Sequence, residues 1–205
     1  MNNLSKDDCD GALPYLSLTS KFENVVRDLL AFRLHKKFQE HKFQQERGWF
    51  AIAREKTFKK KKVDIAIFEG GQQEAFKLPV AIIELKVVAQ PTTIVPHLMD
   101  LDNDLNDAKD NLRESRPDAH PTYLGLLLAR EARALFPDRT GVFKEIIGKY
   151  ELLKPEQDTT LRDVYSQCDE GTRNMSRKGS GKVCCGSDDY IGASVDLSWW
   201  LYSLR

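Results

Sequence analysis

Two kinds of hydrophobic spacing follow one another in the first half of the chain. Between residues 20 and 38 apolar side chains recur three and four positions apart, which predicts a helix, and Ser20 and Glu23 fit a capping box at its start. Three apolar runs that are typical of strands then follow, at 49–53, 63–68 and 78–88. A Gly-Gly pair at 70–71 predicts a turn that brings the second and third strands together as a hairpin.

Helix and strand patterns alternate in the second half of the chain. Residues 96–114 predict an amphipathic helix, and its apolar face carries Leu98, Leu101, Leu105, Ala108 and Leu112. An apolar run at 123–129 is typical of a buried central strand, and 142–153 predicts a further helix. Residues 155–187 are polar and rich in Gly, Ser and Lys, so we expect a long loop there.

This order of elements indicates an α/β fold with a mixed central sheet flanked by helices. We expect a single domain over residues 1–205. Its core would cover about 20–153, followed by a polar excursion at about 155–187 and a C-terminal segment at 190–205 that docks as a strand.

Composition supports a soluble globular protein, because 41% of the residues are hydrophobic and 30% are charged. The formal net charge is zero, so contact with a nucleic acid would have to come from local basic patches. The apolar runs are too short to span a bilayer, and the polar N-terminal residues show no signal pattern. We therefore expect a cytoplasmic protein without membrane contact, in which the four cysteines are reduced and unpaired.

Charged residues interrupt two of the predicted strands. Asp64 lies between Val63 and Ile65, and the third strand carries Glu84 and Lys86. Because side chains alternate along a strand, Glu84 and Lys86 share one face. Charges inside an apolar strand are costly unless they are paired or bound to a metal.

The predicted hairpin brings Asp64 close to Glu84. Two neighbouring carboxylates repel each other, and a divalent cation relieves that repulsion. Hard oxygen ligands suit Mg²⁺ or Mn²⁺, which can activate water and polarise a phosphodiester. A nearby lysine can orient the water or offset charge in the transition state. These residues therefore predict a metal site that acts on a phosphate.

The spacing of these charges resembles the signature of the PD-(D/E)xK nuclease superfamily, which includes many restriction endonucleases. The matching residues are Asp64 and, after a gap of 19 residues, Glu84-Leu85-Lys86. The resemblance covers about residues 20–130 and implies a restriction-endonuclease-like core. It implies that Asp64 and Glu84 hold Mg²⁺, with Mn²⁺ as a substitute, and that the backbone carbonyl of Leu85 is a further ligand. Lys86 would assist the nucleophilic water, and Glu23 would be another acidic residue near the metal.

The same resemblance implies DNA as the substrate. Val63 stands where the motif name has proline, and the Gln-xxx-Tyr element of exonuclease-like members is not found after Lys86. We therefore expect an endonuclease of restriction or repair type rather than an exonuclease. Since nucleases that cut both strands are often homodimers, we also expect a homodimer.

Structural alternatives stand beside these assignments. Glu84 and Lys86 can form an ion pair on an edge strand, with Asp64 ending a lysine turn. The capping box accounts for Glu23 locally. A basic run precedes the second strand and is either a solvated turn or a set of phosphate contacts beside the metal: Lys59, Lys60, Lys61 and Lys62.

Asp100, Asp102 and Asp104 have the spacing of a calcium loop. Leu105 stands where that loop requires glycine and Asn111 where it requires glutamate, so we assign these aspartates to a helix face.

Two aromatic and basic features of the C-terminal region have simple interpretations. Trp199 and Trp200 indicate packing in a core or interface rather than stacking on bases. The basic residues of the 155–187 segment fit a plain loop better than a DNA-contacting one.

Three functional hypotheses remain open. The first is a Mg²⁺-dependent endonuclease acting on DNA. The second is a non-catalytic nucleic-acid-binding or assembly module on the same fold, which the zero net charge favours. The third is an unrelated α/β protein with a surface ion pair at these positions.

Overall fold

Six strands form one mixed sheet in the order β1-β2-β3-β4-β6-β5. The computed structural model describes residues 22–40, 49–70, 78–89, 91–134, 158–188 and 193–205. The strands are β1 (Trp49–Phe58), β2 (Lys61–Gly70), β3 (Pro79–Val88), β4 (Thr122–Ala134), β5 (Met175–Asp188) and β6 (Ala193–Leu204). The helices are α3 (Phe22–Gln39), the short 3₁₀ helix η1 (Pro91–Thr93), α5 (Ile94–Ser115) and α7 (Asp158–Glu170).

The strands β3 and β4 run parallel, and every other neighbouring pair in this sheet is antiparallel. The connection from β3 to β4 passes through α5, as a crossover between parallel strands requires. This confirms the predicted α/β class and the mixed sheet. The predicted strands at 49–53, 63–68, 78–88 and 123–129, and the predicted helices at 20–38 and 96–114, all correspond to observed elements.

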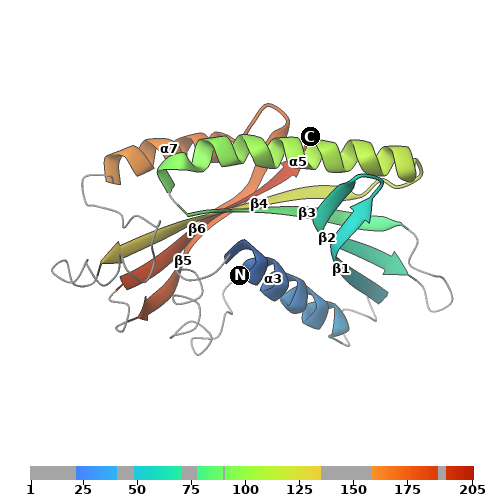
Figure 1. Ribbon diagram of the computed structural model, residues 1–205, viewed down its shortest axis with the longest axis horizontal. Coiled ribbons are helices and arrows are strands. Elements are labelled where there is room, and N and C mark those ends of the chain that lie inside the picture. Colours follow the sequence, from blue (N-terminus) through green and yellow to red (C-terminus); the bar gives the residue numbers. More distant parts are fainter. Residues whose placement is uncertain (1–21, 41–48, 71–77, 90, 135–157, 189–192) are drawn as a thin grey trace.

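Helices cover both faces of the sheet (Figure 1). The helix α5 runs along one face together with α7, and α3 lies against the opposite face. The apolar stripe predicted for α5 is buried. Its first half packs with side chains of β3, β4 and β6, and Ala108 and Leu112 pack with side chains of β1, β2 and β3. On the other face Ala31 of α3 packs in a cluster with Ile65, Ile67 and Ile83 of β2 and β3. These apolar contacts hold α5 against one face of the sheet and α3 against the other.

The expectation of a long loop at 155–187 is wrong. Residues of this segment form α7 and the edge strand β5. The helix follows from Leu161, Val164, Tyr165 and Cys168, whose spacing of three and four places them on one face against the core. The polar composition of the surrounding sequence hid this stripe.

The strand β5 is rich in glycine because it lies against a tryptophan of β6. Gly181 pairs with Trp199 across the two strands. A Cβ atom at Gly181 would lie 2.9 Å from Nε1 of Trp199, whereas one at Gly179 would lie 3.5 Å from the same indole ring. The small residues that resembled a loop therefore make room for an aromatic side chain.

The remaining sequence expectations have clear outcomes. The docked C-terminal strand is confirmed as β6, which lies between β4 and β5. Trp200 is buried and Trp199 packs against the cluster of Leu85, Leu126 and Leu128, so the packing interpretation of both tryptophans holds.

Three further points concern a cysteine, a predicted helix and the membrane. Cys168 is a buried free cysteine. The helix predicted at 142–153 lies outside the described residues. Over the ranges given above, no helix has the length and apolar character needed to cross a membrane.

The contact of β5 with Trp199 makes a testable difference between two glycines. We expect Gly181→Ala to lower the free energy of unfolding by about 1–3 kcal/mol, since the new methyl group overlaps the indole ring. Gly179→Ala is the matched control, and its cost should stay below about 0.5 kcal/mol. Urea unfolding of the two variants measures the difference, and equal costs would contradict this account of β5.

Candidate active site

The strands β2 and β3 separate in the middle of the sheet. The last pair between them is Ile65 opposite Ile83. Toward the start of β2 and the end of β3 the two strands no longer pair with each other, although β2 stays paired with β1 and β3 with β4. Asp64 and Glu84 are the first residues after this separation. We call the region between residues 61–64 of β2 and 84–88 of β3 the fork.

Carboxylates replace β2 as the partners of β3 along the fork. Oδ2 of Asp64 accepts a hydrogen bond of 2.8 Å from the backbone N–H of Leu85. Oε2 of Glu23, in α3, accepts one of 3.3 Å from the backbone N–H of Val87. Because an extended residue directs its N–H and C=O to the same side, the carbonyl of Leu85 also faces the fork. Carboxylate and carbonyl oxygens thus gather along one edge of β3.

Glu84 is the most deeply buried acid of the fork. The residue is only 4% exposed. Its Oε1 is buried and has no hydrogen-bond partner among the described residues. The ammonium group of Lys61 lies 3.9 Å from this oxygen, beyond hydrogen-bond distance. A buried carboxylate oxygen without a donor is costly, and an arriving cation would remove that cost.

Two glutamates of the fork, Glu84 and Glu23, resist ionisation in the absence of a cation. Burial and then repulsion from Asp64 raise the pKa of Glu84 to about 8, although Lys61 opposes the shift. Burial also raises the pKa of Glu23, and the hydrogen bond from Val87 opposes that shift. A bound divalent cation would reverse this balance, because it favours the charged form of every nearby carboxylate.

Two lysines meet one carboxylate on the α5 side of the fork. Nζ of Lys61 donates to Oδ1 of Asp104 at 2.6 Å, and Nζ of Lys86 lies 2.7 Å from Oδ2 of the same residue. Burial alone would lower the pKa of Lys86, but its hydrogen bond to Asp104 outweighs this and raises the pKa above its ordinary value. Lys86 is therefore held as a cation on the same strand face as Glu84.

Arg27 supplies a third cation from α3. Its Nη1 lies 4.0 Å from Oδ1 of Asp64 and donates a hydrogen bond of 3.0 Å to Glu55. Glu55 has a φ of 51°, a left-handed conformation that is strained for a residue with a Cβ atom. Backbone strain of this kind is concentrated at functional sites.

The structure brings together the site residues predicted from the motif. Asp64, Glu84 and Lys86 lie at the fork, and the predicted alternation of Glu84 with Leu85 along β3 is confirmed. The carboxylate of Glu23 contacts β3, so its position is explained by the fork rather than by helix capping alone.

The four consecutive lysines do not share one environment. Lys61 belongs to the fork, and Lys60 is exposed in the turn between β1 and β2. Lys59 forms an ion pair with Glu114, and Lys62 forms one with Glu55. Carboxylates therefore neutralise part of this basic run, and its contact with a nucleic acid stays a prediction.

Oxygen donors at the fork suit a hard cation. Within the described part of the chain, no three Asp, Glu, His or Cys side chains lie close enough to hold a metal together. Mg²⁺ commonly needs only one or two carboxylates, because it keeps several of its waters. Asp64, Glu84 and the carbonyl of Leu85 fit that requirement, and the partnerless Oε1 of Glu84 is the atom that most needs a cation.

Sequence reasoning missed Asp104 and Arg27. The calcium-loop interpretation of Asp104 was correctly rejected, since this residue lies in α5. Helical periodicity nevertheless places Asp104 beside the buried Leu101 and Ala108, three and four positions away, which is the signal that it faces the sheet. Arg27 has no comparable signal, because its importance depends on where α3 docks.

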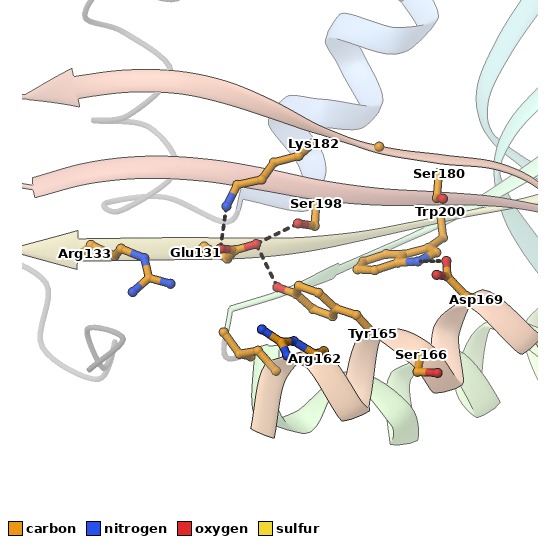
Figure 2. A pocket seen from close by; sticks show the side chains of 12 residues that line it. Glu131, Arg133, Arg162, Tyr165, Ser166, Asp169, Ser180, Lys182, Ser198 and Trp200 are labelled. Atoms are coloured by element: carbon orange, nitrogen blue, oxygen red, sulfur yellow. Dashed lines mark hydrogen bonds and ion pairs between the residues drawn. The ribbon is translucent and has the colours of Figure 1, made fainter. Parts of the chain in front are cut away.

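A separate pocket of about 670 Å³ lies where α7 meets β4, β5 and β6. Figure 2 shows its polar wall, in which Tyr165, Lys182 and Ser198 point toward Glu131. The buried carboxylate of Glu131 accepts hydrogen bonds of 2.7–2.8 Å from all three. Burial opposes ionisation of Glu131, but these donors hold its pKa below the usual value. Unlike Glu84, this carboxylate is fully paired, so the pocket wall is a structural network.

The chain was also compared with known proteins. No family model, no curated protein and no solved structure matches it. Interpretation of the fork therefore depends on its residues and their geometry.

The buried Glu84 predicts a pH dependence of stability. Its folded pKa of about 8 lies above the unfolded value of about 4.3, so the folded state holds the proton more tightly. Glu84 therefore favours folding fully below about pH 4 and progressively less as the pH rises through 8. The loss amounts to at most about 5 kcal/mol without divalent cations.

Urea unfolding between about pH 4 and pH 9, in EDTA, measures this effect. Glu84→Gln should remove most of the decline in stability, because glutamine does not ionise. Glu69→Gln changes an exposed glutamate of the same hairpin and should retain the decline. Parallel pH profiles for the wild type and Glu84→Gln would show that Glu84 is not the group responsible.

Proposed function

We propose that this protein is a divalent-metal-dependent nuclease that hydrolyses phosphodiester bonds of DNA. The observation that carries the proposal is the fork, where Asp64, Glu84 and the carbonyl of Leu85 converge beside Lys86. The arrangement agrees with the motif resemblance, and so does a mixed sheet flanked by helices. An endonuclease of restriction or repair type is the specific form that we favour.

Each residue of the fork has a role in the proposed reaction. Asp64 and Glu84 would hold Mg²⁺, which supplies an activated water and polarises the phosphodiester. Lys86, a protonated cation, orients the attacking water and offsets the charge that develops on the phosphate. Glu23 keeps α3 against β3 through Val87 and adds negative charge near the cation.

Arg27 balances this charge from the opposite side. Its guanidinium faces Asp64, so one carboxylate has a counterion before a metal arrives. Oε1 of the buried Glu84 has no hydrogen-bond partner among the described residues, whereas Asp64 accepts a hydrogen bond from Leu85, and this difference identifies Glu84 as the carboxylate that gains most from a cation.

A non-catalytic binding module on the same fold is the second candidate. One observation favours it: no third acidic side chain of the described residues completes a metal cluster at the fork. Such a module would bind DNA equally well with and without Mg²⁺, whereas a nuclease centre requires the cation.

Metal binding has a readout that does not depend on cleavage. Mg²⁺ should raise the thermal unfolding midpoint of the wild type at neutral pH, since it relieves the buried Glu84. The gain is about 2.7 kcal/mol when free Mg²⁺ is about 100 times its Kd. Glu84→Gln should lose most of the shift and Glu69→Gln should keep it. An identical shift in all three proteins would place the metal elsewhere.

Cleavage tests the proposed reaction directly. Supercoiled plasmid and linear duplex would be incubated with the protein in EDTA, Mg²⁺ or Mn²⁺. We expect metal-dependent nicking that falls by about 100-fold or more in Lys86→Ala, because the lysine acts at the reacting phosphate. Lys36→Ala removes an exposed lysine from the far end of α3 and should retain the activity. Equal cleavage by both variants would contradict the role of Lys86.

A further inference from the structure

The carboxylate of Asp104, in α5, forms ion pairs with both lysines of the fork, Lys61 and Lys86. Asp104 offers Oδ1 to Lys61 at 2.6 Å and Oδ2 to Lys86 at 2.7 Å. The two lysines come from different strands, β2 and β3, which no longer pair with each other at this point. Asp104 therefore replaces the missing strand contact as the link between them.

The surroundings make this link rigid. Asp104 lies in α5 between Leu101 and Leu105, both of which are fully buried. The three charged side chains are 18–28% exposed, so they are partly withdrawn from water. Ion pairs at such positions are screened less than those on an open surface. The position of Asp104 is thus set by the core of α5.

We propose that Asp104 is a positioning residue that holds Lys61 and Lys86 together as a two-lysine clamp for the phosphodiester of the substrate. Lys61 is then a second substrate-contacting lysine, in addition to Lys86. This inference rests on the proposed function and assigns two residues to it that the motif does not contain.

The charge of this cluster suits an anion. Lys61 and Lys86 share the single carboxylate of Asp104, so the three side chains together carry one net positive charge. A phosphodiester, which carries one negative charge, would neutralise it.

Geometry separates Lys61 from its neighbours in the basic run. Lys61 contacts Asp104 and lies 3.9 Å from Glu84. Lys59 pairs with Glu114 instead, and Lys62 pairs with Glu55. Its backbone begins β2 three residues before Asp64, which brings its ammonium group to the same side of the sheet as Lys86. A single residue of the run is therefore placed to touch the reacting phosphate.

Steady-state cleavage and duplex binding test the clamp. The variants are Asp104→Asn, Asp104→Glu and Lys61→Ala, with Asp107→Asn as an exposed control on the same helix. We expect Asp104→Asn to lower kcat by about 10- to 100-fold while the Mg²⁺ thermal shift persists, and Asp104→Glu to restore part of the rate. Lys61→Ala should raise KM for a short fluorescent DNA duplex, and Asp107→Asn should match the wild type.

Two results would overturn the clamp. Asp104→Asn with an unchanged kcat would show that Asp104 does not position the lysines. Loss of the Mg²⁺ shift in Asp104→Asn would show that Asp104 is a metal ligand instead.

A separate readout distinguishes failure of the clamp from failure of the proposed function. Proton–nitrogen correlation spectra report how well lysine ammonium groups are held. Signals from Lys61 and Lys86 should be present in the wild type and disappear in Asp104→Asn. If the wild type cuts no DNA, the nuclease proposal fails. The clamp then stands only if these signals disappear and Lys61→Ala weakens duplex binding, and unchanged spectra or binding overturn it.

Discussion

Everything at the proposed active site depends on a break in the hydrogen-bonding of the sheet. A central strand must satisfy its backbone donors, and β3 satisfies them on one edge with β4. On the other edge β2 pairs with β3 only from Ile65 onward, and the carboxylates of Asp64 and Glu23 take its place at Leu85 and Val87. Two acidic side chains thus bond to β3 where β2 does not, which concentrates them at one point.

The same break places two carboxylates, Asp64 and Glu84, close together in different environments. Asp64 accepts a hydrogen bond from a backbone donor and has Arg27 at 4.0 Å, but Oε1 of the buried Glu84 has no hydrogen-bond partner in the described ranges. Burial and the nearby Asp64 raise the pKa of Glu84 to about 8. The buried Glu131 near α7 shows the opposite solution, since three donors surround it and its pKa is lowered. Two buried glutamates of one sheet therefore have different chemistry because only one of them is paired.

The docking of α5 completes the arrangement. Its leucines seat the helix on the sheet, and Gly125, beside Glu84 on β4, leaves room for Leu101 and Leu105. This close packing brings Asp104 to the two lysines. The position of a charged cluster is thus determined by apolar contacts next to it, which is why its geometry can be more definite than that of a surface ion pair.

The sequence by itself determined the periodic elements and the motif. Alternation along β3, the leucine stripe of α5 and the spacing of Asp64 from Glu84 are local properties, so they could be read without coordinates. The structure of residues 158–188 could not be read in this way. Polar residues dilute the apolar stripe of α7, and the glycines of β5 are explained only by the Trp199 ring that lies against them. Tertiary structure alone decided that Arg27 and Asp104 join the fork, and that Lys61 separates from its neighbouring lysines. These contacts join residues distant in the chain, and their distances depend on how both helices pack against the sheet.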